Sequence, residues 1–319
     1  MNSQRIEANF KGKHILSLSQ FDEKSLQTLF TTTDRLITEL ESGKPLTYLQ
    51  GTVATLLFFE PSSRTFSSFA AAIKRMGGDT IDYQNPLQTS SAVKGETLED
   101  TMRVFETYSD FIVMRHPEKG AAQQAANALT QIPILNAGDG IGEHPTQALL
   151  DLYTIYKKFG KLSGLKIALV GDLQNGRTVH SLIQGLAMYP DNTVYLLSPE
   201  RLKLGAEIKN LVQDKLKLIE ITSDEDMPTD AHVWYWTRVQ KERFEDLAEY
   251  EAIKNSFILT PELLEKKGNK DLILMHPLPR VNEIDTRVDS DPRAYYLPHQ
   301  VRNGMYVRMA LVGLVTGKL

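Results

Sequence analysis

The chain has 319 residues, of which 41% are hydrophobic and 24% charged, a formal net charge of −4 and no cysteine. This length exceeds one ordinary core and predicts two domains, while the lack of cysteine excludes disulfides, thiolate zinc sites and a cysteine nucleophile. The negative charge argues against general nucleic-acid binding, and the absence of a long apolar run or a signal-peptide core predicts a cytoplasmic protein without a membrane partner.

The first predicted elements are a helix, a strand and a second helix. Residues 22–40 carry apolar side chains at helical spacing. Residues 52–59 form an apolar run typical of a buried strand, and Pro61 marks a turn after it. Ser62 and Ser63 are suited to cap the amphipathic helix that follows.

The junction between this strand and helix is a candidate anion site. It places Arg64 and Thr65 directly after two serines. A helix N-terminus with free backbone N–H groups, hydroxyls and a guanidinium suits phosphate. An ordinary capped helix with a solvated Arg64 explains the same residues, so both interpretations stay open at this point.

A polar loop follows at residues 84–95, after a short strand predicted at 80–83, and Thr97 then opens a helix with a capping-box-like pattern. Ser90 and Lys94 lie in this loop. An isolated loop lysine is usually solvated, so these two residues gain a role only if a partner site needs them.

Further apolar runs, each followed by a polar cluster, lie at residues 110–114, 132–135, 166–170, 232–236 and 272–275. Strands that alternate with helical patterns predict parallel sheets, whose ligands bind outside the carboxyl ends of the strands. The cationic and imidazole side chains that emerge at such ends are Arg64, Arg115, His144, Arg177 and Arg238. We therefore expect a shared polyanion pocket rather than separate surface charges.

Two nucleotide-binding interpretations are weaker. Residues 171–178 have the spacing of a phosphate loop, but Arg177 stands where the lysine belongs, and no acidic strand signature for magnesium follows. The segment also lacks the G-x-G-x-x-G fingerprint of a dehydrogenase. The histidines are dispersed without metal-ligand spacing, so neither a metal nor another cofactor is expected.

His144 is predicted to act as a hydrogen-bond donor. Pro145 can take the first position of a helix that continues through residues 148–159, which leaves His144 at the cap. An imidazole beside a helix N-terminus is pushed towards its neutral form, which can donate to a carbonyl oxygen. Ser62 and Ser63 lack a G-x-S-x-G elbow, so a covalent serine mechanism is not favoured. The chemistry that the pocket supports is stabilisation of an oxyanion and a phosphate leaving group.

Several short motifs, in order along nearly the whole chain, resemble those of aspartate carbamoyltransferase catalytic chains. They lie at residues 62–65 (SSRT), 94–97 (KGET), 114–117 (MRHP), 144–147 (HPTQ), 170–178 (VGD and GRT), 237–240 (TRVQ) and 276–279 (HPLP). Ornithine carbamoyltransferases share many of them but have a cysteine in the place of Pro277, and residues 238–240 resemble the aspartate-reading pattern. Ser63 stands where the family usually has threonine and keeps the hydroxyl.

The resemblance implies transfer of the carbamoyl group of carbamoyl phosphate to the amino group of L-aspartate. The products would be N-carbamoyl-L-aspartate and phosphate, in the pyrimidine (UMP) biosynthesis route. The residues that would hold the phosphate are Ser62, Ser63, Arg64 and Thr65. Those that would polarise the carbamoyl carbonyl are Thr65, Arg115 and His144.

The resemblance also assigns the remaining groups of the site. The carbamoyl amide would contact Gln147 and the carbonyls of Leu278 and Pro279, across a cis peptide bond between the last two. The residues that would bind the aspartate carboxylates are Arg177, Arg238 and Gln240, a task suited to the planar fork of arginine. Ser90 and Lys94 would come from a neighbouring subunit, so the active unit would be a homotrimer with shared active sites. The catalytic set would be Arg64, Thr65, Lys94, Arg115 and His144.

The implied fold is α/β, with two doubly wound domains that each have a mainly parallel sheet flanked by helices. Residues 1–145 would bind carbamoyl phosphate and residues 146–301 would bind aspartate, while a C-terminal helix within 302–319 packs back on the first domain. A larger assembly with regulatory chains is compatible with the resemblance. Two alternatives stay open: a carbamoyltransferase for another amine such as ornithine, and a non-catalytic phosphate-binding protein on the same fold.

Overall fold

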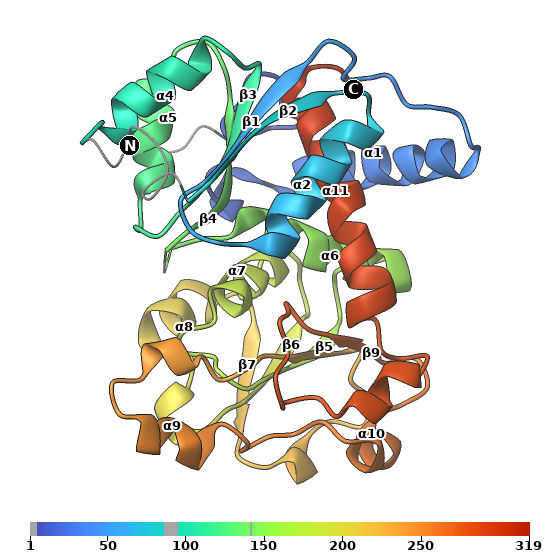
Figure 1. Ribbon diagram of the computed structural model, residues 1–319. Coiled ribbons are helices and arrows are strands. Elements are labelled where there is room, and N and C mark those ends of the chain that lie inside the picture. Colours follow the sequence, from blue (N-terminus) through green and yellow to red (C-terminus); the bar gives the residue numbers. More distant parts are fainter. Residues whose placement is uncertain (1–4, 86–94, 141) are drawn as a thin grey trace. The chain divides into compact units, whose positions relative to one another are not determined.

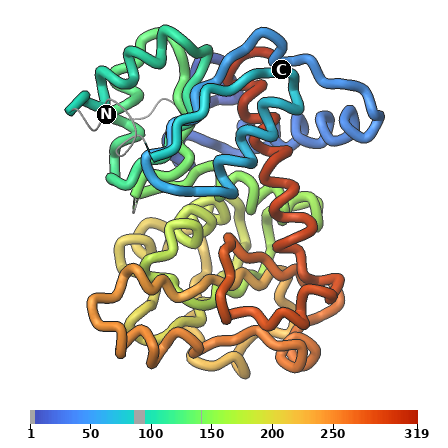
Figure 2. The backbone as a smooth tube through the Cα atoms, viewed as in Figure 1, coloured from blue at the N-terminus to red at the C-terminus, as the bar shows by residue number. Residues whose placement is uncertain are grey.

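The chain forms two compact units, and the computed structural model describes residues 5–85, 95–140 and 142–319 of it. Unit 1 comprises Met1–Tyr153 and Asn303–Leu319, and unit 2 comprises Thr154–Arg302. Figure 2 follows the chain as it leaves unit 1 through helix α6 (Pro145–Phe159) and returns to it through α11 (Val301–Thr316). The boundary between the two units after Tyr153 lies within α6, which runs without a break from Pro145 to Phe159.

Unit 1 is built on a four-stranded parallel sheet in the order β2-β1-β3-β4. Its strands are β1 (Val53–Phe58), β2 (Asp79–Gln84), β3 (Phe111–His116) and β4 (Ile134–Asp139). Helices surround the sheet in Figure 1, and besides α6 and α11 the labelled ones are α1 (Glu23–Glu41), α2 (Ser63–Arg75), α4 (Leu98–Glu106) and α5 (Ala121–Ala128). Strands β3 and β4 are buried along their whole length, as expected for a parallel sheet covered on both faces.

Strand β4 differs from its predicted range of 132–135. It begins after Pro133 and continues through the polar residues Asn136 and Asp139, which the sequence placed beyond the strand. Both side chains are buried and hydrogen-bonded: Asn136 Nδ2 donates to the Leu16 carbonyl at 3.0 Å, and Asp139 Oδ1 accepts from the Glu143 N–H at 2.8 Å. These internal partners allow polar residues to occupy a central layer, because a buried polar group is tolerated when it is hydrogen-bonded.

Unit 2 is built on a five-stranded parallel sheet in the order β7-β6-β5-β8-β9. Its strands are β5 (Lys166–Val170), β6 (Thr193–Leu197), β7 (Lys217–Ile221), β8 (Val233–Trp236) and β9 (Ile273–Met275). The accompanying helices are α7 (Arg177–Leu186), α8 (Ala206–Val212), α9 (Leu247–Ile253) and α10 (Pro261–Lys267). The prediction of an α/β protein with two parallel sheets is confirmed. No helix in the described ranges is long and apolar enough to cross a bilayer.

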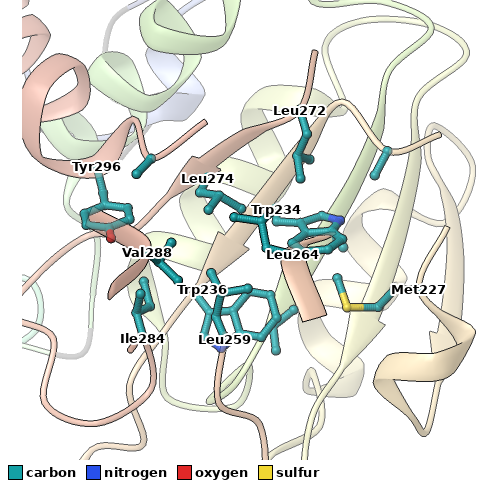
Figure 3. Close-up of a cluster of buried hydrophobic side chains, with 14 of the residues drawn as sticks. Met227, Trp234, Trp236, Leu259, Leu264, Leu272, Leu274, Ile284, Val288 and Tyr296 are labelled. Carbon is teal, nitrogen blue, oxygen red and sulfur yellow. The ribbon is translucent and has the colours of Figure 1, made fainter. Parts of the chain in front are cut away.

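The core on one face of the second sheet contains both tryptophans of the chain, Trp234 and Trp236. Their rings contact each other with centroids 5.9 Å apart. Figure 3 shows Leu264, from α10, beside the Trp234 ring in this cluster. The aliphatic and aromatic side chains fix the position of β8, whose carboxyl end carries one of the predicted binding segments.

Truncating Leu264 should destabilise unit 2. Leu264 is 1% exposed, so Leu264→Ala removes buried methyl groups and leaves a cavity, at a cost of about 2–5 kcal/mol in the free energy of unfolding. Urea unfolding followed by tryptophan fluorescence measures it, since both tryptophans report on this core. Leu211→Ala, at a helix residue that is 58% exposed, is the matched control and should change the free energy by less than about 0.5 kcal/mol. Equal effects of the two changes would contradict this description of the core.

Candidate active site

The first turn of α2 presents backbone donors and hydroxyls after the end of β1. Ser62 holds the N-cap position, as predicted, but its side chain makes no capping hydrogen bond. Ser63 and Arg64 are exposed, whereas Thr65 is buried. The first N–H groups of a helix lack intrahelical acceptors, and the helix dipole is positive there. The phosphate site expected from the sequence would lie at this end of α2.

Arg115 lies near the end of β3 and is only 8% exposed. Its Nη2 forms an ion pair with Glu60 Oε2 at 2.7 Å, and its Nη1 donates to the Ala137 carbonyl of β4 at 3.3 Å. Burial lowers the pKa of the Arg115 guanidinium, and the nearby Glu60 carboxylate offsets part of that change. The side chain is thus held as a cation between the segment after β1 and strand β4.

His144 immediately precedes α6, and Pro145 is the first residue of that helix, as predicted. The imidazole is buried, and its Nδ1 lies 3.4 Å from the Thr146 hydroxyl oxygen. Gln147 is on the first turn and donates from Nε2 to Asp151 Oδ1 at 3.0 Å. The segment before the helix is anchored by Glu143, which accepts hydrogen bonds from the Ser17 hydroxyl and the Leu18 N–H.

These groups of unit 1 share one edge of its sheet. Strand β1 pairs with β2 on one side and with β3 on the other, so the strand order reverses between β1 and β3. Ligands of doubly wound sheets bind outside the carboxyl ends of the strands at such a switch point. Arg64 and Thr65 follow β1, and Arg115 belongs to β3, so these residues lie where the topology favours a ligand.

Unit 2 has the same arrangement, with its switch point between β5 and β8. Asp172, after β5, accepts from the Asn175 N–H at 2.9 Å and from the Gln240 N–H, which follows β8, at 3.4 Å. The Gln240 side chain donates to the Asn175 carbonyl at 3.1 Å. Gly171 must be glycine here, because a Cβ atom would lie 2.1 Å from the Thr237 carbonyl oxygen. Hydrogen bonds therefore connect the predicted binding segment after β5 with the one after β8.

Two arginines belong to these segments. Arg177 is the first residue of α7. Arg238 forms a two-pronged ion pair with Glu242, in which Nη1 donates to Oε2 at 3.1 Å and Nη2 donates to Oε1. Glu242 thus occupies the guanidinium fork that the sequence assigned to a substrate carboxylate. Neither Glu242 nor Glu60 was predicted as a partner, although each lies within four residues of a predicted site arginine.

The segment after β9 is held by a buried histidine and glutamate pair. His276 Nε2 lies 2.8 Å from Glu283 Oε1, and His276 Nδ1 accepts from the Leu278 N–H at 2.8 Å. Glu283 Oε2 accepts from two further backbone N–H groups at 3.0 Å. The Leu278–Pro279 peptide bond is cis, as the resemblance implied. These bonds fix the backbone whose carbonyls were predicted to contact the substrate amide.

Each unit therefore assembles its share of the predicted groups. Unit 1 carries Ser62, Ser63, Arg64, Thr65, Arg115, His144 and Gln147, and unit 2 carries Arg177, Arg238, Gln240, Leu278 and Pro279. Ser90 and Lys94 lie outside the described residues. Within the described residues, no group of three or more His, Asp or Glu side chains is placed to hold a metal ion.

Fold and site together define a two-unit α/β protein with arginine side chains near the switch point of each sheet. A family model described as the carbamoyl-P binding domain of aspartate/ornithine carbamoyltransferase matches residues 13–157. The model of the Asp/Orn binding domain matches residues 163–315. The chain therefore belongs to the aspartate/ornithine carbamoyltransferase family.

Three relatives are similar over nearly the whole chain. The Multifunctional protein pyr1-3 of Dictyostelium discoideum is 47% identical over 96% of this chain, which spans 14% of that protein's length. The aspartate carbamoyltransferase catalytic subunit of Hyperthermus butylicus is 42% identical over 98% of both chains. The crystal structure of aspartate transcarbamoylase from Trypanosoma cruzi with carbamoyl phosphate and aspartate is 40% identical, with a TM-score of 0.90 over 98% of this chain and 99% of that one.

Asp172 should give the stability of unit 2 a measurable pH dependence. Its side chain is fully buried, and burial raises the pKa of this carboxyl above its ordinary value of 3.8. The folded state then binds more protons than the unfolded state, so this residue's contribution to stability falls as pH rises through the interval between the two pKa values. Asp172→Asn cannot ionise. Urea titrations at several pH values give the free energy of unfolding of both proteins. The value for the variant minus that for the wild type should increase with pH from about 4 upwards. A difference that does not change with pH would contradict this.

Proposed function

We propose that the protein transfers the carbamoyl group of carbamoyl phosphate to the amino group of L-aspartate and releases phosphate. The observation that carries this proposal is that arginine, histidine and hydroxyl side chains follow the strands at the switch points of both sheets, in the chain order typical of the family. The T. cruzi relative, similar over nearly its whole length, has been solved with carbamoyl phosphate and aspartate bound. The chain spans 14% of the length of the D. discoideum relative, and the proposed reaction is that of this chain alone.

In unit 1, the first turn of α2 with Arg64 would hold the phosphate group of carbamoyl phosphate. Backbone N–H groups and a guanidinium stabilise the negative charge that grows on phosphate as it departs. Thr65, Arg115 and His144 would donate hydrogen bonds to the carbamoyl oxygen, which becomes an oxyanion when the amine attacks. Arg115 is already desolvated and held by Glu60, so little reorganisation is needed during the reaction.

In unit 2, Arg177, Arg238 and Gln240 would bind the two carboxylates of aspartate. The planar guanidinium pairs with a carboxylate through two parallel hydrogen bonds, and Arg238 makes this arrangement with Glu242. Gln147 of unit 1 and the carbonyls of Leu278 and Pro279 would bind the carbamoyl NH₂ group. We assign carbamoyl phosphate binding to unit 1 and aspartate binding to unit 2, in line with the descriptions of the two family models.

We further propose a homotrimer in which Ser90 and Lys94 complete the active site of a neighbouring subunit. An exposed apolar patch on unit 1 supports a subunit contact. It is formed by Tyr83 and Tyr108, whose rings both contact Phe105. Contiguous exposed apolar surface is typical of interaction sites. A larger assembly with regulatory chains, and a cytoplasmic location, remain predictions from the sequence.

The acceptor amine can be tested directly. Purified protein with carbamoyl phosphate should release phosphate in the presence of L-aspartate and not of L-ornithine, because Arg238 and Gln240 are suited to a second carboxylate rather than an ammonium group. The control is carbamoyl phosphate alone, which corrects for spontaneous hydrolysis. Release with ornithine alone would transfer the assignment to that acceptor, and release with neither amine would favour a binding protein.

Mixing two inactive variants tests the shared site. Arg64→Ala and Lys94→Ala should each lose activity, but a trimer that contains both has sites with an intact Arg64 from one chain and an intact Lys94 from its neighbour. Dissociation and reassociation at equal ratio should restore about a quarter of the wild-type activity, since about one site in four combines both intact residues. Reassociation of each variant with itself is the control. Two inactive variants that stay inactive after demonstrated exchange would contradict a shared site.

A further inference from the structure

Arg308 is a buried cation on α11, the last helix of unit 1. It is not among the residues that would contact the substrates in the proposed reaction. The residue is 4% exposed, and its guanidinium lies over the Phe69 ring, 5.1 Å from the centroid. Nη1 donates to the Ser68 hydroxyl at 2.9 Å, and Nη2 donates to the Thr146 hydroxyl at 3.5 Å. Burial lowers its pKa to about 10, partly offset by Asp151, so the group is charged at neutral pH.

The surroundings of Arg308 are built to accept this side chain. A Cβ atom at Gly304, one helical turn earlier, would lie 3.0 Å from Arg308 Nη1, so glycine leaves room for the guanidinium. Ser68 and Phe69 belong to α2, whose first turn carries Arg64 and Thr65. Thr146 belongs to the first turn of α6, directly after His144. Arg308 therefore connects the two helix ends that carry the predicted carbamoyl phosphate groups.

Thr146 relays this contact to His144. Its hydroxyl oxygen is fully buried and lies 3.5 Å from Arg308 Nη2 and 3.4 Å from His144 Nδ1. A guanidinium has only donors, so the Thr146 oxygen must accept from Arg308. The hydroxyl has one proton and a second lone pair, and the adjacent Arg308 cation favours donation of that proton to His144 Nδ1, which accepts it if this nitrogen carries no proton. Catalytic hydrogen bonds are often long before the substrate binds and tighten in the complex.

We infer that Arg308 and Thr146 are positioning residues that hold neutral His144 as the tautomer with its proton on Nε2. This inference deepens the proposed function, because the Nε2–H group is the one that His144 would offer to the carbamoyl oxygen. A neutral imidazole has one donor and one acceptor, and the hydrogen bond at one nitrogen decides which nitrogen donates. With the opposite tautomer, Nε2 would present a lone pair to the substrate oxygen and repel it.

The test compares Thr146→Val, which removes the hydroxyl at nearly the same shape, with Thr146→Ser, which keeps it. The full chain is labelled with ¹⁵N at histidine, and long-range proton–nitrogen spectra report which ring nitrogen of His144 is protonated. A His144→Gln spectrum assigns the signals. Wild type and Thr146→Ser should show a protonated Nε2 and a bare Nδ1, whereas Thr146→Val should show a substantial population with the proton on Nδ1.

Two further variants separate positioning from packing. Thr33→Val removes another buried helix hydroxyl of unit 1, which donates to the Leu29 carbonyl, and should leave the His144 signals unchanged. Arg308→Met removes the donors at similar length and should weaken the tautomer preference as Thr146→Val does. If Arg308→Met is unfolded by circular dichroism, the two Thr146 variants decide alone. A His144 that carries its proton on Nδ1 in the wild type, or keeps it on Nε2 in Thr146→Val, would overturn the inference.

Kinetics supply the functional half of the test. With carbamoyl phosphate and aspartate, Thr146→Val should lower kcat roughly tenfold, short of the ~10²–10³ that follows complete loss of an oxyanion donor, and Thr146→Ser should stay within about threefold of wild type. Thr146→Ser losing as much activity as Thr146→Val would contradict a role for the hydroxyl. Because the tautomer is measured without turnover, an inactive wild type would overturn the proposed function and leave the NMR result to decide this inference.

Discussion

Positive charge held at the carboxyl ends of parallel strands is the constraint on which the rest of this structure depends. Anion binding needs cations with little water around them, yet removal of water from a guanidinium is costly. Arg115 meets this conflict by pairing with Glu60 and with a carbonyl of β4. Arg308 meets it through two hydroxyls, an aromatic face and the electrostatic influence of Asp151. In both cases the protein supplies partners that stabilise a buried guanidinium cation.

The same constraint explains why many backbone groups of the binding segments are hydrogen-bonded to side chains. Asp172 accepts hydrogen bonds from the segments after β5 and β8, and Glu283 with His276 holds the segment after β9. Preorganised dipoles stabilise a transition state best when they do not have to move as charge develops. A rigid sheet edge with hydrogen-bonded loops is therefore a suitable support for the proposed chemistry, in which the protein orients two anions and no covalent intermediate is required.

The sequence predicted most of the buried strands and placed Arg64, Arg115 and Arg238 next to strand ends, because both features depend on local patterns. Strands such as β5 and β8 are apolar runs covered on both faces, and the rule for parallel sheets places the polar residues after them at a ligand site. Strands β6 and β7 were not assigned. In the case of β7 the reason is that it is a half-exposed edge strand with charged residues such as Lys217 and Glu220. The partners Glu60 and Glu242, and the contact of Arg308 with Thr146 across 162 positions, depend on three-dimensional geometry that no local pattern encodes.

In the proposed reaction, this site joins the carbamoyl carbon to the nitrogen of aspartate. The most direct measurement is an NMR spectrum of the products from ¹³C-labelled carbamoyl phosphate and ¹⁵N-labelled L-aspartate. We expect a product whose carbamoyl carbon shows a one-bond coupling to the aspartate nitrogen, with the wild-type protein and not with Arg64→Ala. Release of phosphate without this coupling, or coupling that appears equally in Arg64→Ala, would contradict it.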